Sequence, residues 1–327
     1  MAERAPVHPS ASSVILVRPT GFGFDPLTAP TNAFQRDLHD PELLPRVFEE
    51  FDGLLEALDR CGIDVTVLDP VDPRAPNAVF PNNWFSTHRD GTVVLYPMCA
   101  PSRRSERDRE MDIRLECEGF VVRKLVDLSA FERDDRFLEG TGSLVLDRER
   151  NIAFAALSPR TSERTLNAWC GVMQGGQVPF LATLDGTLGG QPIYHTNVVM
   201  ALGEGFAVIC LDAIPYPVDR EDVTSELERS GRTVVPITLE QMQQFVGNML
   251  QLRSARDGGS YIFLSEAAFR ALTPTQRMAL RSHGRLVPVP IPTIERVGGG
   301  SVRCMLAENF LERKESPAPS CLSHDLQ

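Results

Sequence analysis

A polar residue stands just ahead of a β-hairpin pattern at nearly constant intervals along this chain. Apolar runs rich in Val, Ile and Phe flank turns that contain Gly, Asp or Arg, which predicts hairpins over 84–97, 142–157, 197–213 and 249–265. The residue before each hairpin, together with a cysteine that opens the last β segment, gives the series Asn83, Glu139, His195, Asn248 and Cys304. The successive gaps are 56, 56, 53 and 56 residues. Five such units nearly use up the 327 residues, so we expect them to close into a ring rather than form an open array.

Helices with regularly spaced apolar residues are predicted between these β segments, over 45–62, 102–119, 161–174, 220–231 and 265–284. The chain is therefore of mixed α/β class. In a closed ring, equivalent positions of the repeat converge on the axis, which would bring Glu139, His195 and Cys304 together. An open α/β fold with two unequal lobes is the alternative.

The net charge indicates the class of partner, and the cysteines indicate the redox compartment. A net charge of -11 argues against nucleic acid and against an anionic membrane surface, because both require a basic patch, so a small molecule is favoured. The seven cysteines form no CxxC pair and no Cys/His metal spacing, which is typical of thiols in a reducing cytoplasm. We expect loose termini at 1–12 and 314–327 around a single domain over 13–313. The sequence permits a homo-oligomer.

A thiol, an imidazole and a carboxylate are the components of nucleophilic catalysis. Cys304 follows three glycines and Arg303, surroundings that favour an accessible thiolate; the alternative is a buried small hydrophobic residue. Asn248 is expected to be a turn residue whose side chain bonds the backbone near the axis. His88, at a hairpin turn, is expected to be solvated.

Several motifs resemble those of the guanidine-modifying enzymes, the pentein superfamily. GGGSVRCM (298–305) is similar to the cysteine segment of that superfamily, LEGTGS (138–143) to its Glu-Gly motif, YHTN (194–197) to its histidine motif and SPRT (158–161) to its arginine-bearing segment. FPNNWFSTH (80–88) falls where its members have their first substrate-gripping segment. The opening 17–35, with FPNNW and GNML (247–250), most closely resembles the bacterial citrulline-utilisation hydrolase group.

The resemblance implies a five-bladed α/β propeller of ββαβ-type modules that needs no metal or organic cofactor. It implies that Cys304 is the nucleophile, His195 the general acid/base and Glu139 the acidic partner of the histidine and the substrate. Arg160 would bind a substrate α-carboxylate. The alternative without a functional role is a solvated charge at the start of a helix. Asn82 and Asn83 fall in the substrate-gripping segment. We expect residues 19–32 to fold back over the mouth of the propeller, with Phe22 as one wall of the site. The alternative is that the Phe22 side chain packs in the core.

Two departures from the superfamily pattern bear on the substrate. Many members have aspartate where this chain has Asn83 and Asn197, and an amide suits a neutral ureido group, whereas two carboxylates suit a guanidinium. The sequence therefore favours a citrulline-like substrate, although some members with asparagine at the first position act on a guanidine. The usual Glu-Gly-Gly-Asp motif is Glu-Gly-Thr-Gly here.

These features predict a cysteine-dependent hydrolase that cleaves a C–N bond of a ureido or guanidino amino acid through a covalent intermediate. Arginine derivatives are allowed as substrates. An amidinotransferase and a catalytically inactive amino-acid-binding protein are the alternatives.

Overall fold

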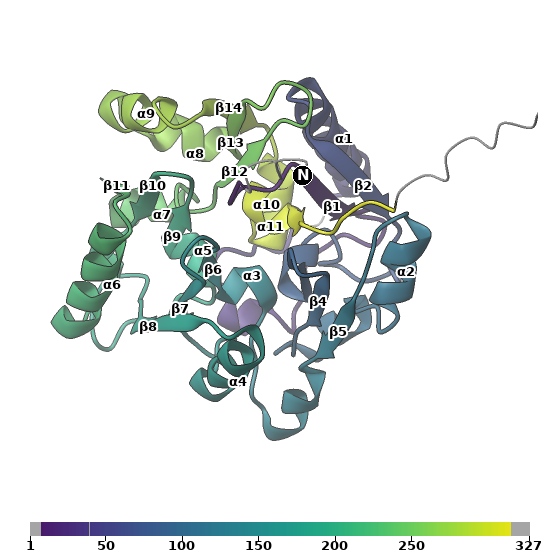
Figure 1. Ribbon diagram of the computed structural model, residues 1–327, viewed down its shortest axis with the longest axis horizontal. Helices are drawn as coiled ribbons and strands as arrows, with labels where there is room; N and C mark the ends of the chain where they lie inside the picture. The colour runs from purple at the N-terminus through teal and green to yellow at the C-terminus, as the bar shows by residue number, and fades with distance from the viewer. Residues whose placement is uncertain (1–7, 39, 315–327) are drawn as a thin grey trace, which may run out of the picture.

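The computed structural model describes residues 8–38 and 40–314. Five three-stranded sheets stand around a common axis, with helices at the periphery (Figure 1). Each sheet holds an antiparallel pair, which is a hairpin in four of the five, and a third strand that joins in parallel after a helical crossover. This arrangement is the expected five-bladed α/β propeller.

Four blades follow the order of the chain. The first holds β3 (Phe85–Thr87), β4 (Thr92–Leu95), α2 (Met111–Cys117) and β5 (Lys124–Asp127). The second holds β6 (Val145–Asp147), β7 (Ile152–Leu157), α4 (Glu163–Met173) and β8 (Gly176–Leu181). The third holds β9 (Met200–Leu202), β10 (Phe206–Ile209), α6 (Pro217–Arg229) and β11 (Thr233–Pro236). The fourth holds β12 (Leu250–Arg253), β13 (Ser260–Ser265), α8 (Glu266–Ala271), α9 (Pro274–Arg281) and β14 (Arg285–Val289).

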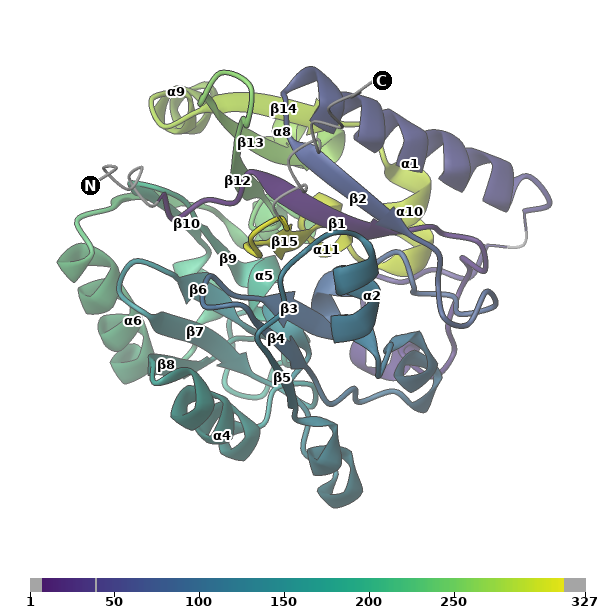
Figure 2. The ribbon, with the colours of Figure 1, turned by 45° about the vertical axis from the view of Figure 1, so that its right-hand side comes forward.

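The fifth blade joins the two ends of the chain. Its inner strand is β15 (Ala307–Asn309), which pairs antiparallel with β1 (Ser13–Val17), and β1 pairs in parallel with β2 (Asp64–Leu68). The crossover between β1 and β2 contains α1 (Leu43–Arg60), whose buried residues recur at helical spacing and face the sheet: Val47, Phe51, Leu54 and Leu58. Figure 2 shows β15 lying against β1. The ring is therefore closed by hydrogen bonds between segments almost 300 residues apart.

Short elements carry the chain into the axis. These are the 3-10 helix η2 (Pro81–Asn83) and the helices α3 (Gly140–Ser143), α5 (Thr196–Val199), α10 (Pro292–Gly298) and α11 (Val302–Met305). The first strands of the blades, β3, β6, β9, β12 and β15, are the inner strands, and β15 contacts β3 while β9 contacts both β6 and β12. The remaining short helices are η1 (Ala29–Thr31), η3 (Pro101–Glu106), η4 (Ser129–Asp134), η5 (Leu211–Ala213) and α7 (Leu239–Gln243).

Two predicted helices are each divided in the structure. The stretch 102–119 is divided into η3 and α2, because Arg103 and Arg107 turn inward to pair with Glu106 and Glu132 instead of lying on a solvated helix face. The stretch 265–284 is divided at Thr273, which caps α9 in a capping box with Gln276.

The ends of the chain were expected to be loose. Residues 8–12 are described and packed, since Ala11 is buried and its carbonyl accepts a hydrogen bond from Arg253 N. The expectations for 1–7 and 315–327 fall outside the described residues. In the described part of the chain, no helix is long and apolar enough to cross a membrane.

Candidate active site

The five residues that mark the sequence repeat meet where the chain enters the inner strands. Asn83 ends η2, Glu139 and His195 directly precede α3 and α5, Asn248 lies two residues before β12, and Cys304 lies in α11. Each of these five residues is at most 2% exposed. The repeat register therefore identifies side chains that gather at one end of the propeller axis.

Glu139 and His195 form a buried pair. Glu139 Oε2 lies 2.8 Å from His195 Nε2, and its other oxygen accepts a hydrogen bond from Cys99 N at 2.9 Å. Burial alone would raise the pKa of Glu139, but Arg160 and His195 hold that pKa well below its ordinary value. Since the ionised carboxylate only accepts hydrogen bonds, His195 Nε2 carries the proton that joins them.

The same burial acts in the opposite direction on His195. It lowers the pKa of the imidazole to about 4, although Glu139 partly opposes the shift. His195 is therefore neutral at pH 7 and can accept a proton. Gly142 leaves room for the ring, because a Cβ at this position would lie 2.7 Å from His195 Nδ1. The glycine at the end of Glu-Gly-Thr-Gly is thus required by the close approach of the imidazole.

Two amide groups surround the sulfur of Cys304. Asn248 Nδ2 lies 3.3 Å and Asn197 Nδ2 lies 3.5 Å from Cys304 Sγ. Asn248 is itself fixed, because it donates to Asn197 O at 2.9 Å and accepts from Arg303 N at 3.0 Å. The side chain of Asn248 bonds the backbone, as expected of it, and it also reaches the sulfur.

The amide of Asn83 is held on both sides. Its Oδ1 accepts a 2.6 Å hydrogen bond from the buried guanidinium of Arg103, and its Nδ2 donates to Asn82 Oδ1 at 2.9 Å. Asn82 in turn donates to Thr141 Oγ1 at 3.2 Å. Arg103 is neutralised by Glu106, whose oxygen lies 2.8 Å away. The acceptor of Asn83 is therefore already in use, while its amino group has a second N–H.

Arg160 connects the site to residues 28–35, which lie over it and which we call the covering segment. Its guanidinium donates to Thr28 O at 2.9 Å and to Thr31 Oγ1 at 2.7 Å, and its Nη1 lies 3.4 Å from Glu139 Oε2. The guanidinium also lies over the ring of Tyr194, 5.0 Å from its centroid. Arg160 is 2% exposed, so the alternative of a solvated charge at a helix start is wrong.

The three glycines before Cys304 lie under this covering segment. Asn32 Nδ2 donates to Gly299 O and Gln35 Nε2 donates to Gly298 O. Gly299 has φ +63°, and a Cβ there would lie 2.7 Å from Asn32 Nδ2. At Gly298 a Cβ would meet the rings of Phe80 and Phe22. The glycines therefore allow the covering segment and two aromatic rings to pack directly on the backbone that leads to the cysteine.

One cavity collects most of these groups, and we call it the Cys304 cavity. Its walls include Asn83, Arg103, Arg160, Tyr194, His195, Gly298–Gly300 and Cys304, together with Thr28, Asn32 and Gln35 of the covering segment. Glu139 and Asn197 lie directly behind this wall. Asn82 bonds Thr141 and Asn83 rather than lining the cavity, and Phe22 packs in the core behind Gly298, so the core alternative holds for Phe22.

Arg103, Asn32 and Gln35 are site residues that the sequence reasoning missed. Arg103 lies in a stretch with the charge pattern of a solvated helix and is far in sequence from the repeat positions, so no sequence signal marked it.

His88, expected to be solvated, is 8% exposed and bonds Ser86 Oγ at 2.9 Å. Among the described residues, no three His, Cys, Asp or Glu side chains are arranged to hold a metal ion.

A five-bladed α/β ring with Cys, His and Glu side chains at its axis defines the pentein superfamily of arginine-modifying hydrolases. Within it, residues 18–311 match the sequence model of the family described as eukaryotic N,N-dimethylarginine dimethylhydrolase, and the chain belongs to this family. This family is one of hydrolases that act on guanidino C–N bonds, and membership in it supports an enzyme of this kind. No curated protein sequence matches the chain.

Solved structures share the fold at low sequence identity. The substrate-bound N-terminal domain of ArgZ, an arginine dihydrolase from cyanobacteria, is 16% identical with a TM-score of 0.68, and the match covers 90% of this chain and 96% of that one. AgrE in complex with L-arginine is 15% identical with a TM-score of 0.70, over 90% of this chain and 39% of that one. A dimethylarginine dimethylaminohydrolase adduct is 15% identical with a TM-score of 0.61, over 91% of this chain and the whole of the other.

Proposed function

We propose that the protein hydrolyses a C–N bond of a ureido or guanidino amino acid, with Cys304 as nucleophile, His195 as general acid/base and Glu139 as its carboxylate partner. The observation that carries this proposal is the geometry of one closed site. The sulfur receives two amide N–H groups there, in a cavity that His195 also lines, and the imidazole is held by an ionised carboxylate.

The chemistry follows from the protonation states. Neutral His195 takes the thiol proton as the sulfur adds to the planar carbon of the substrate, and it returns that proton to the departing nitrogen as the C–N bond breaks. The product is an S-carbamoyl or S-alkylthiouronium cysteine. Water then adds to the same carbon, its proton passes to His195, and the C–S bond breaks to release the thiolate. From citrulline the end products are ornithine, carbon dioxide and ammonia.

Within this reaction we propose a preference for a neutral, citrulline-like ureido group. Arg103 takes one of the two lone pairs of Asn83 Oδ1 with a charged donor, and the second N–H of Asn83 Nδ2 is free to bond a ligand. A ureido oxygen accepts such a bond, whereas a guanidinium has only N–H donors and would leave the group unpaired, at about 1–3 kcal/mol.

A guanidino substrate is the second candidate, and the comparisons favour it. ArgZ is described as an arginine dihydrolase, a variant of its N-terminal domain has been solved covalently bound to a reaction intermediate, and AgrE has been solved with L-arginine. In either case Arg160 and Arg103 are the cations that can meet the α-carboxylate of an amino acid, which would require Arg160 to release part of its hold on Thr28 and Thr31.

Two measurements test these proposals. Ammonia and ornithine release is measured from citrulline, arginine, methylated arginines and succinylarginine with the wild type and Cys304→Ala; turnover that survives in the variant contradicts the nucleophile assignment. Citrulline and arginine binding to Cys304→Ser is then compared by calorimetry and in crystals. Tighter binding of arginine, ordered against Asn83, would overturn the ureido preference and leave the reaction class standing.

A further inference from the structure

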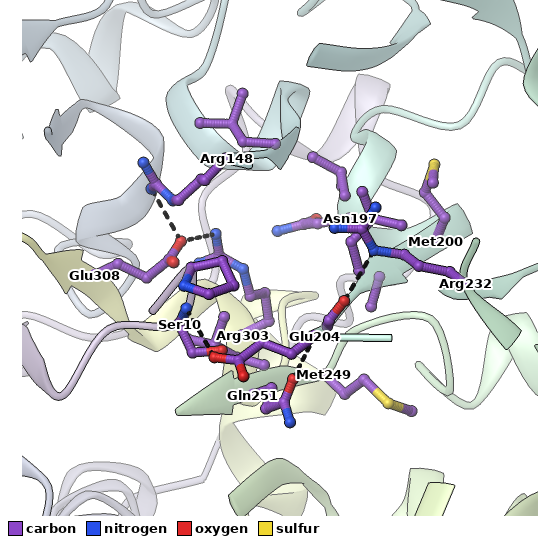
Figure 3. Close-up of a pocket in the computed structure, with 17 residues that line it drawn as sticks. Ser10, Arg148, Asn197, Met200, Glu204, Arg232, Met249, Gln251, Arg303 and Glu308 are labelled. Carbon is purple, nitrogen blue, oxygen red and sulfur yellow. Dashed lines mark hydrogen bonds and ion pairs between the residues drawn. The ribbon is translucent and has the colours of Figure 1, made fainter. Parts of the chain in front are cut away.

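A second cavity lies toward the opposite end of the propeller axis from the Cys304 cavity. The repeat residues precede the inner strands, whereas most residues that line this far cavity lie within or just after those strands, among them Leu146 and Arg148 around β6, Leu202 and Glu204 around β9, Gln251 of β12 and Glu308 of β15. Figure 3 shows the side chains of Arg148, Glu204, Gln251 and Glu308 around one space. Pro9, Ser10 and Glu204 form its half-buried rim.

Asn197 separates the two cavities. Its Nδ2 lies 3.5 Å from Cys304 Sγ, and the same side chain lines the far cavity. Its Oδ1 is buried and has no hydrogen-bond partner among the described residues. A buried amide oxygen without a partner costs about 1–3 kcal/mol, so the oxygen needs a donor. The far cavity, which this side chain lines, is the place from which a water molecule could donate to it.

The lining of the far cavity suits water better than a charged ligand. Glu308 is shared by Arg148 at 3.2 Å and Arg303 at 3.1 Å, as Figure 3 shows, and Arg232 pairs with Asp147 at 2.6 Å. Together with Glu204 at the rim, three carboxylates face the three guanidiniums, so the walls are polar without an excess of positive charge. The cavity has a volume of about 50 Å³. Since roughly 10–15 Å³ of such volume holds one water molecule, there is room for more than one.

The Cys304 cavity offers no comparable space. By the same measure its volume is about 10 Å³, because Asn32 and Gln35 bond the covering segment to the glycine backbone. A bound amino acid would fill this cavity. The hydrolytic half of the proposed reaction nevertheless needs one water molecule at the carbon attached to sulfur.

We propose that the far cavity stores this water and delivers it past Asn197 to the covalent intermediate; the inference rests on the proposed function. The delivered water adds its oxygen to the carbon bound to Cys304 Sγ, its proton goes to His195, and the C–S bond breaks to give the thiolate. Hydrolysis then does not require the covering segment to open first.

The experiment plugs the far cavity from two positions. Ser10→Trp places an indole at its rim, and Ala201→Leu fills its interior from β9. The control is Ser12→Trp, two residues along at an exposed position that does not line the cavity. Adduct formation is followed by rapid quench and mass spectrometry, and steady-state turnover is measured in parallel. Labelling of Cys304 by 2-chloroacetamidine reports that the site is intact in each protein.

We expect both plugged variants to form the adduct at the wild-type rate, accumulate it and turn over about tenfold more slowly. Ser12→Trp should behave as the wild type. Unchanged turnover without accumulation in a plugged variant overturns the water route. A crystal structure of the wild-type adduct is the second measurement: water bound to Asn197 Oδ1 is expected, and a dry far cavity overturns the inference. A wild type that forms no adduct refutes the proposed function instead.

Discussion

The sulfur of Cys304 lies among donors from two other blades, and the nearer of them is Asn248. The amide of Asn248 also bonds Asn197 O and Arg303 N, so it is oriented before any substrate enters. An N–H group aimed at a sulfur stabilises the thiolate over the thiol, because the anion is the stronger acceptor. Asn248 is therefore a positioning residue for the nucleophile.

Replacing Asn248 by Ala tests this role. A hydrogen bond to a charged group contributes about 1.5–3 kcal/mol, so we expect labelling of Cys304 by 2-chloroacetamidine and kcat to fall about tenfold to hundredfold. KM should change little, because Asn248 does not line the Cys304 cavity. Asn248→Asp should be at least as slow, since its carboxylate offers no donor. Asn167→Ala, at an exposed asparagine of α4, is the control. Wild-type labelling in Asn248→Ala would contradict the role.

The residues that the sequence identified and those that it missed differ in how they reach the site. Glu139, His195 and Cys304 stand three to six residues before successive or neighbouring inner strands, so ring closure brings all three to the same end of the axis. Arg103 reaches Asn83 from η3, through a turn whose direction depends on burying an Arg–Glu pair. No periodicity encodes such a contact, because it depends on how an irregular connection of the first blade packs inward.

At the scale of the element, the glycine run 298–300 shows what a short motif can and cannot predict. The sequence indicates close backbone approach or positive φ, and the structure has both. The sequence of the glycine run does not show which groups approach it. These are Asn32, Gln35, Phe22 and Phe80, from segments more than 200 residues away.

Gly299→Ala is expected to loosen the covering segment. The left-handed φ of +63° costs a non-glycine residue about 1–2 kcal/mol, and the new Cβ would push Asn32 and Gln35 from the backbone they bond. We expect a lower Tm and a raised KM. Gly171→Ala in α4 is the matched control, because a Cβ there meets nothing within 4 Å and alanine favours the helix by about 0.5–1 kcal/mol. Equal KM values for Gly299→Ala and the wild type would show that the contact is dispensable.

His88 directly follows strand β3 and is buried, which lowers the stability of the protein in acid. Burial lowers the pKa of His88 to about 3, and burial lowers that of His195 to about 4. In the unfolded chain both titrate near 6.5, so between that pH and their folded values the unfolded state binds more protons. Stability is therefore full above pH 6.5 and falls as the pH drops, by up to about 1.4 kcal/mol per pH unit for each histidine.

His88→Gln isolates one of these contributions. The amide can keep a hydrogen bond to Ser86 Oγ and does not titrate. We expect urea unfolding to show a shallower loss of stability between pH 7.5 and pH 5 than in the wild type, with the difference confined to the acid side. Parallel stability curves for the two proteins across this range would contradict a buried neutral His88.

At the scale of the whole molecule, the sequence repeat predicted a closed ring but not which strands close it. The last marked residue, Cys304, opens a β segment after which the described residues, up to 314, hold no second strand. The structure supplies that strand from the other end, since β1 pairs with β15 through Ser13 and Asn309, Val14 and Glu308, and Ile15 and Ala307. Local patterns predict hairpins between neighbours in sequence, whereas this pairing depends on the geometry of all five blades.

Closure predicts a sharp boundary for truncation at the C-terminus. A chain ending at Leu306 keeps Cys304 but loses β15, which pairs with β1, contacts β3 and carries Glu308 between Arg148 and Arg303. Removing Glu308 leaves two buried guanidiniums without their shared carboxylate, a change that costs several kcal/mol. We expect this protein to lose its cooperative thermal transition and the labelling of Cys304 by 2-chloroacetamidine. A chain ending at Lys314 keeps every described contact of β15 and should match the full chain in Tm and labelling. If the cooperative transition and the labelling both survive removal of β15, the fold does not depend on pairing the two ends of the chain, which contradicts the prediction.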